Sequence, residues 1–306
     1  MWTAATLWVS VLAVGTAYAL VAAHSIAAGG SLVAWVVGAP LLYAGAVAAM
    51  TTVYFALAWI FRSPRPPELQ LGLRQTLRLV WWEFWALAGA APRMMFYRVL
   101  VPDPTPAAVD VPVLLLHGVL CNAGVWRKFA RFLVSRGVAG IYSLSYGPPL
   151  VSIELFAGQM EAKIDAIRSA TGARSVMVVT HSMGGLVARA YLRRYGGGKL
   201  ARLVTIGAPH HGSVHAWMFP GTSLAQLRPG NPWLVALAGE RPDPALRFVS
   251  LWSWHDSMVA PQLSSRLAGT IDVPLAGVGH NALLGDPGVF ARVLAEIDEA
   301  RGGLAR

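Results

Sequence analysis

Ser182 is the residue of this sequence best placed to act as a nucleophile. An apolar run ends in His181 and Ser182, and two glycines and a helical pattern follow. A serine on a tight turn between a strand and a helix needs small residues two positions before and after it, because the backbones crowd there. Gly184 meets this need, whereas Thr180 stands where glycine is usual. The pattern predicts a nucleophile elbow at Ser182, with His181 packed beneath it.

A serine hydroxyl becomes an effective nucleophile only beside a histidine base that a carboxylate orients. In folds with such an elbow, the chain order is serine, then acid, then histidine. Of the histidines that follow Ser182, only His280 comes after the last predicted strand and before the final predicted helix. We therefore expect His280 to be the base.

The same chain order leaves three candidate aspartates between the serine and the histidine. Asp256 follows an apolar run, and so lies at the carboxyl end of a predicted strand, where open α/β sheets bind their ligands. Asp243 lies in a proline-rich segment. Asp272 lies at the start of a strand, on the opposite edge of the sheet. Asp256 is the predicted acid.

Two backbone N–H groups must stabilise the negative charge that develops on an attacked carbonyl oxygen. We expect one from Met183, directly after the nucleophile. We expect the other from Val119, which follows His117 and Gly118 in the loop after the first predicted strand. Glycine at position 118 allows the backbone to approach a substrate closely.

Short apolar runs alternate with helical patterns in the catalytic domain, which we place at residues 106–306. The predicted strands are residues 111–116, 141–146, 176–180, 203–206, 248–252 and 273–278, and the predicted helices are residues 123–136, 152–170, 184–195 and 287–300. This alternation predicts an α/β fold with a mostly parallel, doubly wound sheet. A segment at about 213–246, rich in proline, glycine and large apolar side chains, interrupts the order and is expected to form a cap or lid.

Several of these stretches together resemble the α/β-hydrolase-fold lipases and esterases. Their motifs are most similar in style to those of bacterial triacylglycerol lipases and of inositol-deacylase-like proteins. The resemblance covers residues 111–300, and its matching stretches are residues 115–118, 180–185, 207–212, Asp256 with Val259 and Pro261, and residues 279–280. It implies hydrolysis of acyl esters through an acyl-enzyme intermediate.

No cofactor or metal ion is predicted. His210, His211 and His215 lack the glutamate-containing pattern of a zinc protease. Residues 277–282 imitate a dinucleotide-binding fingerprint, but too little chain follows them to complete such a unit.

Residues 1–61 contain two long runs, 1–28 and 31–61, without any acidic residue, lysine or arginine. Each exceeds the roughly 20 apolar residues that cross a bilayer core. Gly29 and Gly30 separate the runs, so we predict a hairpin of two transmembrane helices whose small residues allow close packing. A cleaved signal peptide followed by one anchor is disfavoured, because no lysine or arginine precedes the first run.

The linker, residues 62–105, carries the charges that set the expected orientation. Four arginines follow the second run, and the turn between the runs has none: Arg62, Arg65, Arg74 and Arg78. The positive-inside rule places the catalytic domain in the cytoplasm, at an inner membrane of bacterial type. A tryptophan-rich stretch around Trp81 and Trp85 predicts an amphipathic helix that lies on the head groups. A helix packed on the catalytic domain is the alternative.

The composition of the 306-residue chain agrees with contact with lipid. It is 55% hydrophobic and 13% charged, with a net charge of +10 and a single cysteine. The basic residues form no stripe and no nucleic-acid motif occurs, so membrane lipids are the expected partner and nucleic acid is not.

The leading hypothesis is a membrane-anchored serine hydrolase that cleaves lipid-like acyl esters. Acyl transfer or thioester hydrolysis would use the same residues. A membrane scaffold with a catalytically silent domain is the non-enzymatic alternative.

Overall fold

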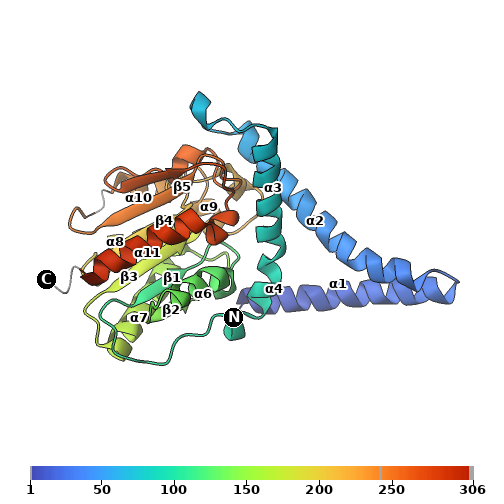
Figure 1. Cartoon of the computed structure of the whole chain (residues 1–306), viewed down its shortest axis with the longest axis horizontal. Helices are drawn as coiled ribbons and strands as arrows, with labels where there is room; N and C mark the ends of the chain where they lie inside the picture. The colour runs from blue at the N-terminus through green and yellow to red at the C-terminus, as the bar shows by residue number, and fades with distance from the viewer. Residues whose placement is uncertain (1, 241–242, 303–306) are drawn as a thin grey trace.

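The structure is a computed structural model of the chain and describes residues 2–240 and 243–302. Six strands form one parallel sheet in the order β2-β1-β3-β4-β5-β6 (Figure 1). The strands are β1 (Val113–Leu116), β2 (Ile141–Leu144), β3 (Val176–His181), β4 (Leu200–Ile206), β5 (Phe248–Ser253) and β6 (Ile271–Leu275). The predicted parallel α/β fold is confirmed, and each predicted strand is present with its ends shifted by a few residues.

Helices cover both faces of the sheet, because alternate side chains of a strand point to opposite sides. The covering helices are α6 (Arg127–Ser135), α7 (Ile153–Thr171), α8 (Met183–Tyr195) and α11 (Pro287–Gly302). Leu114 and Leu116 of β1 pack in the core under α7 and α8, whereas Val113 and Leu115 pack in the core under α6 and α11. The central strands are therefore buried on both sides, as parallel strands usually are.

The strand order places the ends of β1 and β3 side by side. From β1 the chain moves outward to β2 and then returns to β3 on the other side of β1. An open sheet forms a crevice beyond the carboxyl ends of its strands at such a switch point. Ser182 directly follows β3, and Gly118 comes two residues after β1. The topology thus brings both predicted site segments to one place.

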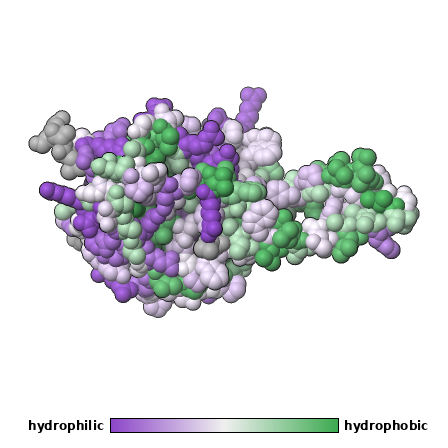
Figure 2. Space-filling model, turned by 90° about the horizontal axis from the view of Figure 1, so that it is seen from below, coloured by the Kyte–Doolittle hydropathy of each residue, from purple (hydrophilic) through white to green (hydrophobic). Residues whose placement is uncertain are grey.

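Two apolar helices precede this fold, α1 (Trp2–Ala27) and α2 (Leu32–Ile60), and they fit a hairpin. Both are long and apolar enough to cross a membrane, and most of their surface is exposed. Figure 2 shows the result, a hydrophobic projection beside a body whose surface is largely hydrophilic. Soluble monomeric proteins rarely expose apolar surface on this scale.

The two helices touch at their turn and diverge toward the catalytic domain (Figure 1). Near the turn, the Tyr18 hydroxyl donates to the Trp35 carbonyl at 2.6 Å. Gly38 of α2 lies against the Tyr18 hydroxyl of α1, whereas Gly15 and Gly45 face open space. The expected close packing is therefore confined to the part of the hairpin near its turn. Elsewhere the described helices pack on the linker, α1 on α4 (Ala90–Met95) and α2 on α3 (Leu73–Ala88).

The linker forms a 3₁₀ turn and three helices. These are η1 (Pro67–Leu69), α3 (Leu73–Ala88), α4 (Ala90–Met95) and α5 (Tyr97–Leu100). Helix α3 buries Leu79 and Glu83 and exposes Trp81, Trp82 and Trp85. One face of this helix therefore packs on the domain, as the alternative prediction states, and the tryptophans lie on its exposed face.

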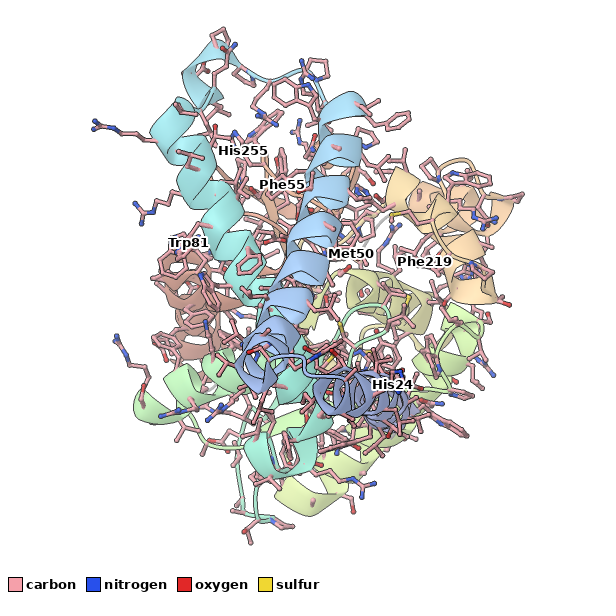
Figure 3. The ribbon with its side chains drawn as sticks, turned by 90° about the vertical axis from the view of Figure 1, so that its right-hand side faces the viewer. His24, Met50, Phe55, Trp81, Phe219 and His255 are labelled. Carbon is pink, nitrogen blue, oxygen red and sulfur yellow. The ribbon has the colours of Figure 1, made fainter. Side chains whose placement is uncertain are left out.

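Helix α2 lies across the edge of the sheet that carries the strands' carboxyl ends. In Figure 3 it passes between α3, which carries Trp81, and the segment that carries Phe219. Its buried face consists of Val47, Thr51, Tyr54 and Ala58. The carbonyl of Tyr54 is 3.1 Å from His215 Nε2, which belongs to the segment after β4.

The segment at 213–246, predicted to be a cap, contains short helical turns. These are η3 (Val214–Trp217), α9 (Thr222–Gln226) and α10 (Pro232–Gly239); η2 (Ala123–Trp126), η4 (Gln262–Ser265) and η5 (Ala282–Gly285) lie elsewhere in the domain. The Trp233 indole donates to Glu154 of α7 at 2.7 Å, which ties α10 to the domain. Trp217 and Phe219 are exposed.

Gln262 joins the end of α2 to the catalytic domain. Its side-chain oxygen accepts from the buried Ser63 amide at 3.0 Å, and its nitrogen donates to the carbonyls of Asp256 and Ala58 at 3.2 and 3.5 Å. Its removal would leave buried polar groups without partners, which costs about 1–3 kcal/mol.

We therefore expect Gln262→Ala to lower the free energy of unfolding by about 2 kcal/mol, measured by denaturant titration of the full chain in detergent. The exposed Gln70 gives a matched control, because Gln70→Ala should change stability by less than about 0.5 kcal/mol. Equal effects of the two substitutions would contradict the proposed role of Gln262.

Candidate active site

Ser182 occupies a strained turn between β3 and α8. Its φ of 55° and ψ of −128° lie outside the regions that non-glycine residues normally adopt. The turn is held by two backbone hydrogen bonds of 2.9 Å, from the Ser182 amide to the Ile206 carbonyl and from the Gly185 amide to the Ser182 carbonyl. This geometry matches the predicted elbow, in which the side chain projects from the end of the sheet.

Two glycines around this turn lie where a larger side chain would be crowded. A Cβ at Gly184 would lie 2.7 Å from the His117 carbonyl oxygen and 2.9 Å from that of Leu116. A Cβ at Gly118 would lie 3.0 Å from Ser182 Cβ and 3.5 Å from Ser182 Oγ. The loop after β1 therefore passes directly against the nucleophile.

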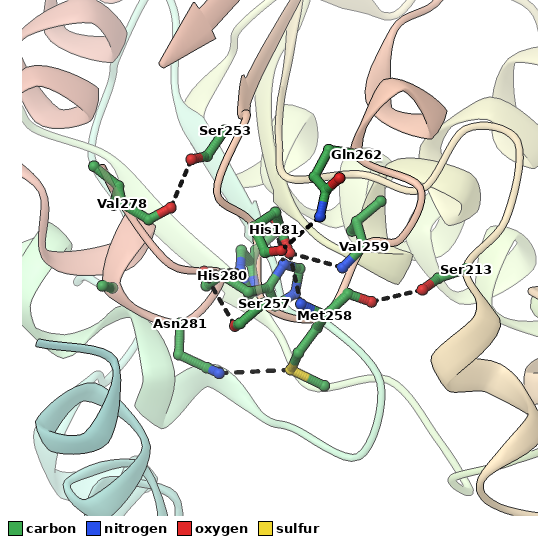
Figure 4. Close-up of polar contacts among 12 residues, drawn as sticks. His181, Ser213, Ser253, Ser257, Met258, Val259, Gln262, Val278, His280 and Asn281 are labelled. Atoms are coloured by element: carbon green, nitrogen blue, oxygen red, sulfur yellow. Dashed lines mark hydrogen bonds and ion pairs between the residues drawn. The ribbon is translucent and has the colours of Figure 1, made fainter. Parts of the chain in front are cut away.

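Asp256 and His280 form a buried pair, with 2.9 Å between Asp256 Oδ2 and His280 Nδ1. The other carboxylate oxygen of Asp256 accepts from the amides of Met258 and Val259 at 2.8 and 2.7 Å. Figure 4 shows the turn that these contacts form and the neighbouring Ser257 and Gln262. The hydrogen bond to Asp256 assigns the proton to Nδ1, which leaves Nε2 of His280 free to accept one.

Asp256 and Glu83 together outweigh the effect of burial on the pKa of His280. Burial by itself lowers the pKa of His280, but the Asp256 charge, its hydrogen bond and the charge of Glu83 together raise this pKa above the ordinary 6.5. The pair therefore favours an imidazole that readily takes up a proton.

Gly207, at the end of β4, lies between the elbow and this pair. A Cβ there would be 3.2 Å from Asp256 Oδ2 and 3.3 Å from His280 Nδ1, and the preceding Ile206 accepts from the Ser182 amide. The described residues contain no hydrogen bond between Ser182 Oγ and His280. Such contacts often tighten only when substrate binds.

The amides expected to bind an oxyanion lie beside the nucleophile. Met183 is the first residue of α8, so its N–H has no acceptor within that helix. Val119 directly follows Gly118, which lies against Ser182. The two predicted donors thus come from the two segments that meet at the switch point.

The neighbouring histidines have supporting contacts. His181 Nε2 is 3.1 Å from the His280 carbonyl oxygen, and the two rings lie 4.6 Å apart between centroids. Burial, and then the proximity of His280, hold the pKa of His181 well below 6.5. His117 stacks on Tyr146 at 4.0 Å, and burial lowers its pKa to about 4. Both imidazole rings are therefore uncharged, and they line the site beside Ser182 and His280.

The three histidines considered as metal ligands have separate partners. His210 lies 3.3 Å from Thr205 Oγ1, and His211 lies 3.1 Å from the Arg266 carbonyl oxygen. His215 contacts the carbonyl of Tyr54 in α2. Within residues 2–240 and 243–302, no cluster of three or more histidine, cysteine, aspartate or glutamate side chains has the arrangement of a metal site.

Sequence reasoning missed Glu83, which reaches the site from α3. Its side chain is fully buried and accepts hydrogen bonds from Asn281 and Ala282, which follow His280, and from Ser257, which follows Asp256. A signal was present, because Glu83 is the only acidic residue between Glu68 and Asp103 and lies within a tryptophan-rich helix.

Comparisons with known proteins agree with the fold. A family described as having the alpha/beta hydrolase fold matches residues 111–285. The mature form of Bacillus licheniformis lipase BlEst2 is similar in structure, with a TM-score of 0.54 and 16% identity over 64% of this chain and 93% of that one. Aspergillus fumigatus lipase B has a TM-score of 0.55 and 21% identity, over 62% of this chain and 53% of its own. At these identities the likeness to both lipases is one of fold.

We expect Gly118→Ala to lower kcat/KM for a soluble ester at least about tenfold, because its new methyl group would displace the nucleophile. Gly158→Ala is the matched control, since its Cβ would lie at an ordinary 3.6 Å from the Tyr195 hydroxyl. The thermal unfolding midpoint of each variant reports its folding. Unchanged turnover by Gly118→Ala would mean that the loop after β1 does not border the reacting centre.

Proposed function

Since this chain belongs to the family of proteins with the α/β-hydrolase fold, we propose that it is a membrane-anchored serine hydrolase that cleaves lipid-like carboxylic esters. The observation that carries the proposal is the strained Ser182 turn beside the buried Asp256–His280 pair, in the chain order that such enzymes use.

In the proposed reaction, Ser182 Oγ attacks the ester carbonyl carbon as Nε2 of His280 takes the hydroxyl proton. Asp256 holds the opposite ring nitrogen and stabilises the imidazolium that forms. The amides of Val119 and Met183 donate to the oxyanion. The tetrahedral intermediate collapses, the alcohol leaves with the proton from His280, and an acyl group remains on Ser182. Water, activated by His280, then releases the carboxylic acid.

The anchoring in a membrane is supported by the way the hairpin joins the domain. The Thr3 hydroxyl donates to the Cys121 carbonyl at 3.0 Å, so α1 begins beside the loop after β1. The end of α2 docks on the acid loop through Gln262. Both ends of the hairpin thus meet the domain at the edge that carries the site, while the apolar turn points away.

This arrangement favours an ester that partitions into lipid. The candidate site faces the base of an apolar hairpin, and Trp217 and Phe219 expose aromatic rings on the segment next to α2. The exposed tryptophans of α3 suit the head-group region, where such side chains concentrate. A substrate that diffuses within the membrane surface would reach this edge of the sheet without crossing water.

We expect Ser182→Ala to abolish hydrolysis of p-nitrophenyl acyl esters and labelling by a fluorophosphonate probe, because both require the Ser182 oxygen. Thermal unfolding of the variant should stay close to that of the unaltered chain. Ser223→Ala, at another buried serine, is the matched control and should retain labelling. Labelling of the Ser182→Ala variant would refute the assignment of the nucleophile.

Orientation can be tested with the same probe in membrane vesicles. The arginines after α2 predict that the catalytic domain lies in the cytoplasm. A membrane-impermeant fluorophosphonate should then label Ser182 in inverted vesicles and not in sealed right-side-out vesicles. The opposite pattern would place the domain outside, and recovery of the chain in the soluble fraction would contradict anchoring.

A further inference from the structure

Glu83 is a buried carboxylate that enters the active site from outside the α/β-hydrolase domain. It lies on α3 and has no exposed surface. One oxygen, Oε1, accepts from Ser257 Oγ at 2.6 Å and from the amide and side-chain nitrogens of Asn281 at 3.0 and 2.8 Å. The other, Oε2, accepts from the Ala282 amide at 2.9 Å.

The partners of Glu83 surround His280. Asn281 and Ala282 directly follow this histidine in the chain, and Ser257 directly follows Asp256. The Ser257 hydroxyl also accepts from the His280 amide at 3.3 Å, so its proton is directed to Glu83. All four donors therefore point at Glu83, an arrangement that suits a carboxylate, whose two oxygens act as acceptors.

The residue before His280 is shaped to fit the same carboxylate. A Cβ at Gly279 would lie 2.5 Å from Glu83 Oε2 and 2.8 Å from its carboxyl carbon. The loop that carries His280 is thus in contact with Glu83 from residue 279 to residue 282.

We propose that Glu83 is a positioning residue for His280, which fixes the loop carrying this base and places a second negative charge beside it. This proposal rests on the role of His280 proposed above. In this proposal α3, a helix of the linker between the apolar hairpin and the domain, supplies a residue that positions the catalytic base.

The charged and titratable groups around His280 indicate how Glu83 acts. Asp256 pairs with the ring, His181 lies beneath it, and His215 and Glu83 approach from η3 and α3. Burial lowers the pKa of both neighbouring histidines, so they are neutral. Two carboxylates therefore act on one imidazole, and both raise the pKa of His280 against the effect of burial.

The negative charge of Glu83 raises the pKa of His280. Loss of the negative charge at position 83 weakens the preference of His280 for its protonated form, so the pKa of His280 falls. Catalysis needs the neutral base, so the acidic limb of the pH profile of kcat/KM would move to lower pH. A residue that only filled space would leave this limb where it is.

The test uses the full chain in lipid nanodiscs with isotope-labelled histidine. Titration of the His280 ring by NMR, assigned by comparison with His280→Gln, gives its pKa without any need for turnover. We expect a lower pKa in Glu83→Gln, which keeps the shape of the side chain and removes its charge. Glu68→Gln is the matched control, because it removes the same charge from the exposed η1 turn of the same linker.

Kinetics add a second, separate readout. We expect Glu83→Gln to shift the acidic limb of kcat/KM downward, and Glu83→Ala, which leaves buried donors unpaired, to lose at least about tenfold in kcat/KM. An unchanged His280 pKa in Glu83→Gln would overturn the proposal, as would an equal shift in Glu68→Gln. If the unaltered chain hydrolyses no ester, the proposed function fails, while the NMR titration still decides the role of Glu83.

Discussion

Burial of the Asp256 carboxylate is the constraint on which the candidate site depends. A carboxylate removed from water must be met by hydrogen-bond donors, because an unpaired buried charge is strongly unfavourable. The amides of Met258 and Val259 and the ring of His280 supply these donors. The turn they form leads into η4, where Gln262 receives the end of α2. One buried charge therefore connects strand β5, the base and the apolar hairpin.

Much of this arrangement could be predicted from the sequence, because the information is local. Strands that are buried on both faces appear as short apolar runs, and their alternation with amphipathic helices indicates a parallel sheet. Once the strands are located, the carboxyl ends of β3 and β5 identify Ser182 and Asp256, and the loop after β6 identifies His280. Thr180 departs from the usual glycine, yet the turn forms, and Gly184 lies against the carbonyls of Leu116 and His117 at the end of β1.

Contacts between distant segments could not be predicted in the same way. Glu83 and its partner Asn281 are 198 residues apart, and no periodicity connects them. The small residues of the hairpin predicted close packing, but α1 and α2 each have a stronger partner in the linker helices. The tryptophan-rich helix suited both a membrane surface and a protein surface, and α3 has one face packed on the domain and one exposed face rich in tryptophan. These outcomes depend on which surfaces compete for a helix, and that information is spread over the whole chain.

The contacts of Glu83 also have a consequence for when the active site can fold during synthesis of the chain. The family match begins at residue 111, but the contacts of the domain extend into the linker, because the loop of His280 has its hydrogen-bond acceptor on α3. If the hairpin is a membrane anchor as proposed, a chain synthesised from its amino terminus would present α1 and α2 to the membrane before the sheet exists. The histidine loop would then fold against a helix that is already in place. Such an order would delay the onset of activity until the hairpin has inserted, and a truncated, soluble catalytic domain would be an immature form.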